Sequence, residues 1–274
     1  MAVRAFTNFL FVPGNRPERY AKALASEADL VCIDLEDSVP LAEKDDARSV
    51  AMAAIAGHGD GRLALRINGL RTAAGLEDIL ALCASRLPEY LFVAMVESAT
   101  EIEILRSLLG ADIAFVPLLE SVKGLRAAHA IAASPGVAAI MFGGGDFAGE
   151  LGVKLEWEPL LLARSELAMA CAAANIRAID VPYIDLENET GLANECAKAK
   201  ALGFRAKAAI HPKQIDAINA AMRPHAAEIE EAKAAIAAFD AGGGAAIRFE
   251  GKMLEAPLIR RYRQILSSGE SQNA

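Results

Sequence analysis

The residues of this chain best suited to chemistry are carboxylates that follow short apolar runs. Asp146 comes directly after three successive glycines and the apolar run 137–141. These glycines allow a sharp turn and a close approach of the backbone to a ligand. Asp146 would then offer a hard oxygen to a bound cation, although aspartate is also a common N-cap of helices. On this stretch alone both interpretations are open.

Other polar residues follow the remaining apolar runs in the same way. In chain order they are Asp34, Glu36, Asp37, Arg66, Asn68, Glu97, Glu120, Asp180 and His211. The carboxyl ends of the strands of a parallel barrel meet at one mouth, where the functional loops are built. The sequence therefore predicts several carboxylates and one arginine at a single site. Glu97 is predicted equally well as a loop residue, and His211 as a structural one.

A divalent cation is the simplest partner for carboxylates that would otherwise repel one another. Hard oxygen donors favour Mg²⁺, or Mn²⁺, over zinc. Mg²⁺ is typically held by one or two protein carboxylates, with water and substrate oxygens completing its coordination. We predict Glu120 and Asp146 as the metal ligands, and Glu36 and Asp37 as residues that could hold metal-bound waters.

Arg66 is predicted at the same mouth, where its planar guanidinium suits a substrate carboxylate. A site with Mg²⁺ and an arginine suits a 2-oxo or 2-hydroxy acid. The metal can chelate carboxylate and carbonyl oxygens and, as a Lewis acid, stabilise an enolate. The chemistry indicated is the making or breaking of a carbon–carbon bond next to a carbonyl.

About eight strand–helix units must position these residues. The predicted strands are 6–12, 30–33, 63–67, 90–94, 113–118, 137–141, 177–180 and 206–210, and the helices between them include 16–25, 43–56, 73–84, 99–109, 122–132, 159–174, 192–202 and 213–222. Short apolar strands that alternate with helices imply parallel pairing through right-handed crossovers. The pattern predicts an α/β fold, the TIM (β/α)8 barrel. An open doubly wound sheet is the alternative, but Gly-x-Gly-x-x-Gly is absent after the first strand.

The character of the chain changes beyond Pro224. A predicted helix over 226–238 leads to a glycine-rich hinge at 241–245, a short strand or hairpin at 247–253 and a final helix at 257–266. Such an appendage cannot build a core alone. We therefore predict a catalytic barrel domain over 1–223 and an extension over 224–274 that covers the barrel mouth or contacts a neighbouring subunit.

Composition excludes several classes of protein. The formal charge of −8 argues against a nucleic-acid-binding or anionic-membrane-binding surface. No apolar run approaches the roughly 20 residues that span a bilayer, and no secretory signal is evident. The four cysteines are scattered, with no CxxC spacing, which favours reduced thiols in a cytoplasmic protein.

Six segments together resemble a known family. They are 9–14 (FLFVPG), 34–39 (DLEDSV), 65–68 (LRIN), 117–121 (PLLES), 142–146 (FGGGD) and 209–215 (AIHPKQI). Each segment is weak alone, but in this order they resemble the citrate lyase β-subunit-like branch of the HpcH/HpaI aldolase family. The resemblance covers nearly the whole chain.

The resemblance implies a TIM barrel that makes or breaks carbon–carbon bonds in acyl thioesters with Mg²⁺. The thioester would be carried on CoA or on an acyl-carrier protein. It also implies Glu120 and Asp146 as metal ligands, with Arg66 and Glu120 contacting substrate. Relatives are often trimers, and a C-terminal segment can close over a neighbour's active site.

Three departures from the family pattern concern the substrate rather than the metal. Ala94-Met95 replaces a usual Pro-Lys pair after the fourth strand, so any role of that lysine is lost. Thr7-Asn8 replaces a usual Arg-Ser before the first strand, which puts expected contacts to the thioester carrier in question. In the C-terminal segment, Glu255 follows a Gly-x-Met sequence. It supplies the acidic residue expected there, as a glutamate with a longer side chain.

The predicted function is a Mg²⁺-dependent carbon–carbon lyase. It would cleave or form a 3-hydroxyacyl thioester, such as malyl-, citramalyl- or citryl-CoA, with an acyl thioester and a 2-oxo acid as products. The predicted catalytic residues are Arg66, Glu36, Asp37 and Glu255, with Asp37 and Glu255 as alternative bases. A homo-oligomer, trimer or hexamer, is expected. The alternatives are an aldolase of free 2-oxo acids without CoA, and a non-catalytic subunit of a lyase complex.

Overall fold

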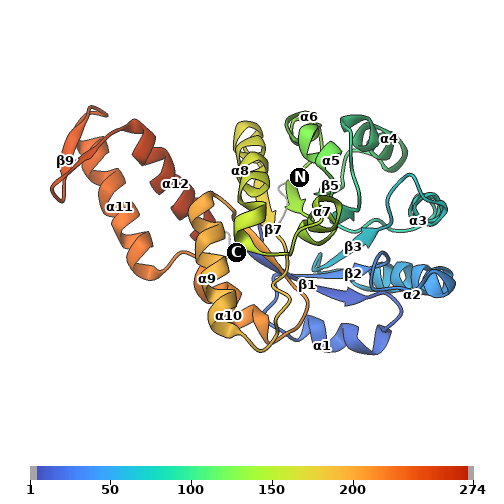
Figure 1. Cartoon of the computed structure of the whole chain (residues 1–274). Coiled ribbons are helices and arrows are strands. Elements are labelled where there is room, and N and C mark those ends of the chain that lie inside the picture. The colour runs from blue at the N-terminus through green and yellow to red at the C-terminus, as the bar shows by residue number, and fades with distance from the viewer. Residues whose placement is uncertain (1–4, 271–274) are drawn as a thin grey trace.

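Eight parallel strands close into a barrel in the computed structural model, which describes residues 5–270 (Figure 1). The strands are β1 (Asn8–Pro13), β2 (Leu30–Asp34), β3 (Leu63–Ile67), β4 (Tyr90–Val93), β5 (Ala114–Leu119), β6 (Ala139–Phe142), β7 (Arg177–Asp180) and β8 (Ala206–Ala209). Each strand pairs with the next in sequence, and β8 pairs with β1 to close the barrel. The predicted TIM barrel is confirmed, and the open sheet is excluded.

Apolar side chains fill both sides of the strands. One cluster packs between the strands and the surrounding helices, and a second fills the barrel interior. The interior cluster includes Phe9 and Phe92, whose ring centroids lie 4.7 Å apart. Strands buried on both faces require nearly continuous apolar runs, which is why the sequence pattern marks them clearly. Because the interior is filled, a substrate site must lie at the rim.

The helices follow the predicted order with two differences. They are η1 (Pro17–Arg19), α1 (Tyr20–Leu24), η2 (Leu41–Glu43), α2 (Lys44–Gly57), α3 (Ala73–Cys83), α4 (Ala99–Leu109), α5 (Val122–Arg126), α6 (Ala128–Ala132), α7 (Gly144–Leu151), α8 (Trp157–Ala174), α9 (Glu189–Leu202) and α10 (Gln214–Met222). The expected helix over 16–25 opens as a 3₁₀ turn with proline at its start. The expected single helix over 122–132 is broken at Ala127, whose backbone (φ −90°, ψ 0°) leaves the helical region.

The C-terminal extension forms a small unit of its own. It contains α11 (Ala226–Ala241), the antiparallel hairpin of β9 (Ile247–Phe249) and β10 (Lys252–Leu254), and α12 (Ala256–Glu270). Its core consists of Ala235, Phe239, Leu254 and Ile259. Figure 1 shows this unit projecting to one side of the barrel, beyond α9 and α10. The predicted hairpin is confirmed, while α11 runs into the stretch expected to be a hinge.

Within residues 5–270, no helix is both long enough and apolar enough to cross a membrane. The cysteines are free thiols, three of them buried and Cys83 exposed.

Candidate metal and substrate site

A pocket of about 370 Å³ lies at the carboxyl ends of the strands. It brings together five of the residues predicted at the mouth, Asp34, Asp37, Arg66, Glu120 and Asp146, from the ends of four different strands. The remaining lining residues are Phe11, Pro13, Ser38, Met141, Gly143, Gly145, Val181, Pro182 and Ile210. The structure thus places carboxylates and an arginine together in one pocket, as the sequence predicts.

Arg66 is buried at the pocket wall, and its guanidinium is already partly engaged. Asp34 accepts from Nε at 2.6 Å and from Nη2 at 2.7 Å, so one edge of the planar group is filled. Nη1 lies 2.8 Å from Glu36 and 3.9 Å from Asp37. The guanidinium also stacks over the ring of Phe11, 4.7 Å from the centroid. A substrate carboxylate can therefore meet Arg66 only from its Nη1 side, and the open fork expected from the sequence is absent.

Asp34 organises this wall, a role that the sequence did not reveal. Its carboxylate accepts the backbone N–H of Glu36 at 2.9 Å and of Ser38 at 3.1 Å, so it also caps the loop after β2. Burial opposes the charged form of Asp34. Arg66 and the hydrogen bonds from Ser38 and Glu36 outweigh that effect and hold its pKa below the usual value. The buried ion pair with Arg66 is thus charged and fixed.

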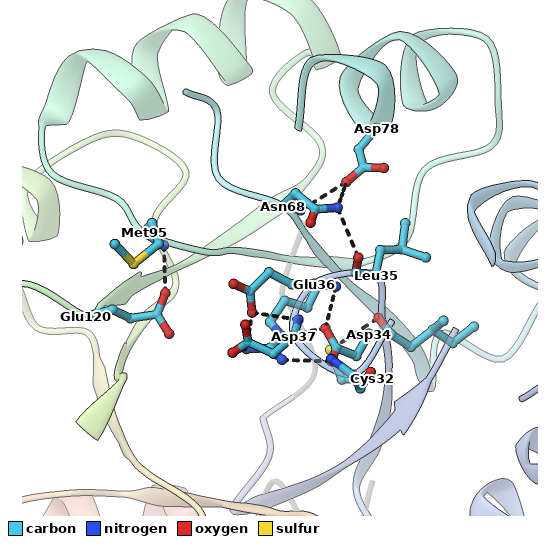
Figure 2. A network of polar contacts seen from close by, with 12 residues as sticks. Cys32, Asp34, Leu35, Glu36, Asp37, Asn68, Asp78, Met95 and Glu120 are labelled. Atoms are coloured by element: carbon cyan, nitrogen blue, oxygen red, sulfur yellow. Dashed lines mark hydrogen bonds and ion pairs between the residues drawn. The ribbon is translucent and has the colours of Figure 1, made fainter. Parts of the chain in front are cut away.

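Glu120 stands opposite this wall and is held by the backbone of the loop after β4 (Figure 2). The N–H of Met95 donates to Glu120 Oε2 at 2.7 Å. Met95 adopts a φ of +56°, which is uncommon for a residue other than glycine, and Arg71 binds its carbonyl at 2.9 Å. Strained backbone that the surroundings over-determine is typical of functional sites. Glu120 Oε1 accepts no hydrogen bond within the described chain.

The glycine before α7 makes room for Glu120. A Cβ built on Gly143 would collide with the Glu120 side chain. This close approach, rather than flexibility, accounts for glycine at that position. The glycine-rich turn and the carboxylate on the neighbouring strand are therefore parts of one arrangement.

Asp146 lies in the first turn of α7, and Gly143 is the N-cap of that helix. The alternative of a capping aspartate is therefore set aside. Asp146 is exposed at the pocket, with no hydrogen-bond or ion-pair partner among residues 5–270. Burial and the nearby Asp37 raise its pKa, against the opposing effect of Arg66. Its carboxylate is free to bind a cation.

The carboxylates of this mouth hold protons that a cation would displace. Burial raises the pKa of Glu120 to about 7, with Arg66 and the Met95 N–H opposing and Asp146 adding to the rise. Burial, together with Glu120 and Asp37, raises the pKa of Glu36 to about 8 despite Arg66. Burial is the largest cause of both shifts, and the neighbouring carboxylates add to it.

The loop after β2 carries Glu36 and is rigidly fixed. Lys44 Nζ donates to the carbonyls of Leu35 and Glu36 at 2.8 Å each, and to Asn68 Oδ1 at 2.7 Å. Asn68 in turn binds Asp78 (Figure 2). Asn68, one of the polar residues expected at the mouth, therefore acts through this loop rather than on a ligand.

Asp180 was predicted at the mouth, and this prediction is wrong. Its carboxylate is fully buried, 2.9 Å from Arg164 Nε and 2.7 Å from Lys207 Nζ. Lys207 also binds Glu195 at 2.8 Å. Asp180 points into a buried ion network between β7, β8 and α8, because two cations there compensate it.

Four other expected site residues do not line the pocket, and one of them, Glu36, forms an ion pair with Arg66. Glu97 binds Ser121, Arg71 and Lys123 at 3.0 Å each and ties together the rim loops. His211 accepts the N–H of Lys213. Glu255 lies in the extension, so a catalytic role for it requires a neighbouring copy.

Thr7 and Asn8 lie at the amino end of β1, the end of the barrel opposite the pocket. They bind Asp29, and Asn8 also binds Asn219. Contacts to a thioester carrier at the mouth therefore do not involve them. The departure from the family pattern at these positions affects the barrel floor instead.

The donor set of this mouth fits Mg²⁺. Within residues 5–270 there is no group of three or more His, Cys, Asp or Glu side chains placed to hold a metal. Glu120 and Asp146 make a set of two carboxylates. That number suits Mg²⁺, which keeps water or substrate oxygens in its remaining positions, and it does not suit a site closed by protein ligands alone.

Comparison with known proteins agrees with this geometry. The sequence model of the HpcH/HpaI aldolase/citrate lyase family matches residues 8–212, and a model of carbon–carbon bond lyases of the TIM-barrel fold matches residues 165–268. Both matches support the resemblance found in the sequence segments.

Three curated relatives align over nearly the whole chain. The (3S)-malyl-CoA thioesterase of Cereibacter sphaeroides is 31% identical, with 97% of this chain and 95% of the relative covered. The L-malyl-CoA/beta-methylmalyl-CoA lyase of the same organism is 30% identical, with 95% and 93% covered. The citrate lyase subunit beta of Escherichia coli is 33% identical, with 97% and 94% covered.

The protein CitE from Mycobacterium tuberculosis, solved in complex with magnesium, acetoacetate and coenzyme A, has a similar structure. It is 31% identical, with a TM-score of 0.83 over 97% of this chain and 99% of that chain. Sequence model, relatives and structure agree over the whole barrel. The chain belongs to the HpcH/HpaI aldolase/citrate lyase family.

Proposed function

We propose that this protein is a Mg²⁺-dependent carbon–carbon lyase. It cleaves a 3-hydroxyacyl-CoA, such as malyl-, citramalyl- or citryl-CoA, into an acyl thioester and a 2-oxo acid, or forms it from them. The observation that carries the proposal is a single pocket lined by two carboxylates with raised pKa values, Glu120 and Asp146, together with the cation Arg66. The lyases of malyl-CoA and citrate among its relatives support this assignment.

Glu120 and Asp146 would hold the metal. Bound there, Mg²⁺ supplies a Lewis acid for the carboxylate and carbonyl oxygens of a 2-oxo acid. The similar CitE structure contains magnesium and acetoacetate. The raised pKa values of both carboxylates favour the same arrangement, because burial and neighbouring carboxylates disfavour their charged forms and a bound divalent cation would stabilise those forms.

Arg66 would bind the carboxylate of the 2-oxo acid through Nη1, which Asp34 leaves free and which the substrate would share with Glu36. Asp34 fixes the plane of the guanidinium, so little side-chain entropy is lost when the substrate binds. A charge-assisted hydrogen bond from Arg66 would also set which end of the substrate faces the metal ligands.

Cleavage breaks the bond between the thioester α-carbon and the carbon that carries the hydroxyl. A base takes the hydroxyl proton, that carbon becomes the carbonyl of the 2-oxo acid, and the electron pair remains on the thioester fragment as an enolate. Protonation of its α-carbon then gives the acyl thioester. Asp37, exposed at the pocket, and Glu255 of a neighbouring copy are both candidates for the base.

The thioester carrier would lie over the turn after β1. Arg16 and Arg19 are exposed there, on the loop and 3₁₀ turn that follow Pro13, a pocket residue. Guanidinium groups suit the phosphates of CoA. Coenzyme A is present in the similar CitE structure.

We further propose that residues 224–274 act as a lid on a second copy in a cytoplasmic homo-oligomer, a trimer or hexamer. The extension has its own small core and does not line the pocket of its own chain.

Two variants test this lid. Asp146→Ala and Glu255→Gln are each expected to be inactive. After co-refolding in equal amounts, activity should return to at most about a quarter, because half the mouths and half the lids remain intact. No recovery would exclude a lid acting between copies, and an active Glu255→Gln would exclude that base.

Turnover of malyl-CoA and citramalyl-CoA, with Mg²⁺ and with EDTA, tests the main proposal. Release of a 2-oxo acid, trapped as a hydrazone, with no free CoA is the expected result, and EDTA should abolish it. Release of CoA thiol without a 2-oxo acid would instead identify a thioesterase. The thioesterases among the relatives make this the second candidate function.

The same assay separates the remaining alternatives. Cleavage of a free 4-hydroxy-2-oxo acid, with no turnover of either thioester, would identify an aldolase of free 2-oxo acids. Mg²⁺ binding, measured by calorimetry, without turnover of any of these substrates would support a non-catalytic subunit.

A further inference from the structure

A side cavity of about 350 Å³ adjoins the metal pocket, next to the loop after β7. Val181 and Pro182 line both cavities. A Cβ built on Gly144 would lie 3.1 Å from Leu155 and 3.3 Å from Val181, and both of these residues line the side cavity. Because Gly144 belongs to the turn that carries Asp146, the side cavity lies directly against the proposed metal-binding turn.

Two buried side chains fix the loop that supplies much of the side cavity. Its apolar and aromatic lining residues are Leu155, Trp157, Val181, Pro182, Tyr183 and Ile184. Lys207 donates to the carbonyl of Val181 at 2.7 Å, and Gln214 donates to the carbonyl of Tyr183 at 2.6 Å. Across the cavity, the ring of Trp157 has the guanidinium of Arg164 at 4.7 Å from its centroid. The cavity is therefore preformed, and a ligand group that enters it orders few protein groups.

The charged residues of the side cavity disfavour an anion. Four carboxylates line it, those of Glu156, Glu158, Asp185 and Glu195, against one ammonium group, that of Lys198. Lys198 lies 3.6 Å from Glu158, so the lining offers no unpaired cation among the described residues. A carboxylate or phosphate of a ligand would meet like charge there. An uncharged apolar group suits both the charge and the aromatic lining.

The position of the side cavity favours the 2-oxo acid fragment as the owner of that apolar group. In the proposed reaction this fragment is held by Glu120, Asp146 and Arg66, and the side cavity adjoins the turn that carries Asp146. The thioester carrier is proposed over the basic turn at Arg16 and Arg19, after β1. The phosphates of CoA suit that turn and do not suit an acidic cavity.

We propose that the side cavity binds an apolar side chain, larger than methyl, on the hydroxyl-bearing carbon of the thioester substrate. The 2-oxo acid would then be branched-chain or aromatic, of the class of 4-methyl-2-oxopentanoate. This inference rests on the proposed function and narrows its substrates, since citryl-CoA would bring a second carboxylate to the acidic lining. In the direction of synthesis, the α-carbon of acetyl-CoA loses a proton and bonds to the carbonyl carbon, and the carbonyl oxygen takes up a proton to become the hydroxyl.

Binding of 2-oxo acids in the presence of Mg²⁺, measured by calorimetry, tests the proposal independently of turnover. The wild-type protein should bind 4-methyl-2-oxopentanoate roughly tenfold or more tightly than pyruvate, because additional apolar carbons are buried. 2-Oxoglutarate, of similar length but with a second carboxylate, should bind no more tightly than pyruvate.

Two matched variants locate the binding of the side chain. Asn194→Trp places an indole at a lining position of the side cavity and should reduce the preference for 4-methyl-2-oxopentanoate to less than about threefold. Ala193→Trp places the same group at the exposed neighbouring position of α9, outside the cavity, and should preserve the preference. Equal binding of the two acids by the wild type, or an unchanged preference in Asn194→Trp, would overturn the proposal.

Condensation of acetyl-CoA with each 2-oxo acid, followed by mass spectrometry of the thioester product, separates this proposal from the function on which it rests. Product from glyoxylate and pyruvate, with no preference for 4-methyl-2-oxopentanoate in binding or turnover, would overturn the role of the side cavity alone. A preference for hexanoyl-CoA over acetyl-CoA, in place of one among the 2-oxo acids, would do the same. No product from any acid would count against the lyase, and no binding of any acid would overturn both.

Discussion

Asp34 sets the geometry of the pocket at the scale of single residues. It holds two nitrogens of Arg66 and caps the loop that carries Glu36 and Asp37. Removing one partner of a buried ion pair leaves an uncompensated buried charge, which costs far more than losing an exposed pair. Substrate binding and stability therefore depend on the same carboxylate.

Asp34→Asn is expected to lower the free energy of unfolding by about 3 kcal/mol at neutral pH, because Arg66 loses its buried counter-charge. Urea denaturation measures this change. The matched control is Asp37→Asn, since Asp37 is exposed and lies 3.9 Å from the same arginine. That control should change stability by less than about 0.5 kcal/mol. Equal effects of the two changes would refute the role of Asp34.

The lowered pKa of Asp34 predicts how its contribution to stability changes with pH. A carboxylate whose native pKa lies below its unfolded value stabilises the fold above the unfolded pKa. That contribution is lost as pH falls through the native pKa. The difference between wild type and Asp34→Asn should therefore shrink in acid.

Asp146→Ala is expected to reduce Mg²⁺-dependent turnover by more than about 100-fold, because a proposed ligand is removed. The fold should persist, since Asp146 is exposed and unpartnered within the described chain. Turnover and circular dichroism check the two parts. Asp112→Ala, at an exposed carboxylate outside this pocket, serves as the control. Unchanged turnover in Asp146→Ala would remove Asp146 from the metal site.

At the scale of elements, the turn between β6 and α7 places one carboxylate and makes space for another. Gly143 lies against Glu120 of the neighbouring β5, while Asp146 follows within the first helical turn. The strained loop at Met95 completes the arrangement from the far side of β5. Two connections thus converge on the Glu120 carboxylate.

Gly143→Ala is expected to weaken Mg²⁺ binding by roughly tenfold or more, because the new Cβ would displace the Glu120 carboxylate. The backbone itself tolerates alanine, since φ at Gly143 is −88°. Calorimetric titration with Mg²⁺ measures the effect. Gly149→Ala in the same helix meets nothing within 4 Å and should leave Mg²⁺ binding unchanged. Equal affinities in the two variants would contradict this account of the turn.

At the scale of the whole molecule, the barrel separates two charged ends. The mouth gathers carboxylates with raised pKa values, and the opposite end carries Arg177, Arg205 and Arg261, for which residues 5–270 supply no ion pair. The packed interior between them keeps the two ends independent. Changes in pH or in bound ions at one end should therefore leave the charged groups at the other end unaffected.

The raised pKa values at the mouth predict a pH-dependent effect of Mg²⁺ on stability. The native pKa values of Glu120, about 7, and Glu36, about 8, exceed the usual 4.5, so the metal-free native state binds more protons than the unfolded chain. Stability from these protonated groups is complete below the unfolded pKa and is lost as pH rises through the native values. Mg²⁺ competes with these protons for the carboxylates. At high pH its binding should compensate for the stability that is lost when they ionise.

Thermal unfolding with and without saturating Mg²⁺ checks this prediction. The rise in midpoint should be larger at about pH 8.5 than at about pH 6, because fewer protons compete with the metal. Asp146→Ala should show no such difference. A rise that is equal at the two pH values, or larger at the lower one, would contradict the assignment of protons to this mouth.

The barrel could be predicted from the sequence, because each strand is buried on both faces and must be continuously apolar. It also placed Arg66, Glu120 and Asp146 at one mouth, since residues that follow parallel strands share one end of the barrel. The six family segments added the class of chemistry, which the family match confirms.

The directions of the side chains, and which of them are already paired, could not be predicted without the folded structure. Asp180 and Asp146 each lie at a strand's carboxyl end, yet Asp180 turns inward because Arg164 and Lys207 meet it there. Asp34 engages Arg66 because β2 and β3 pair these two residues in register. Such contacts join residues far apart in the chain. Local sequence cannot specify them, because they depend on strand register and on what the neighbouring element supplies.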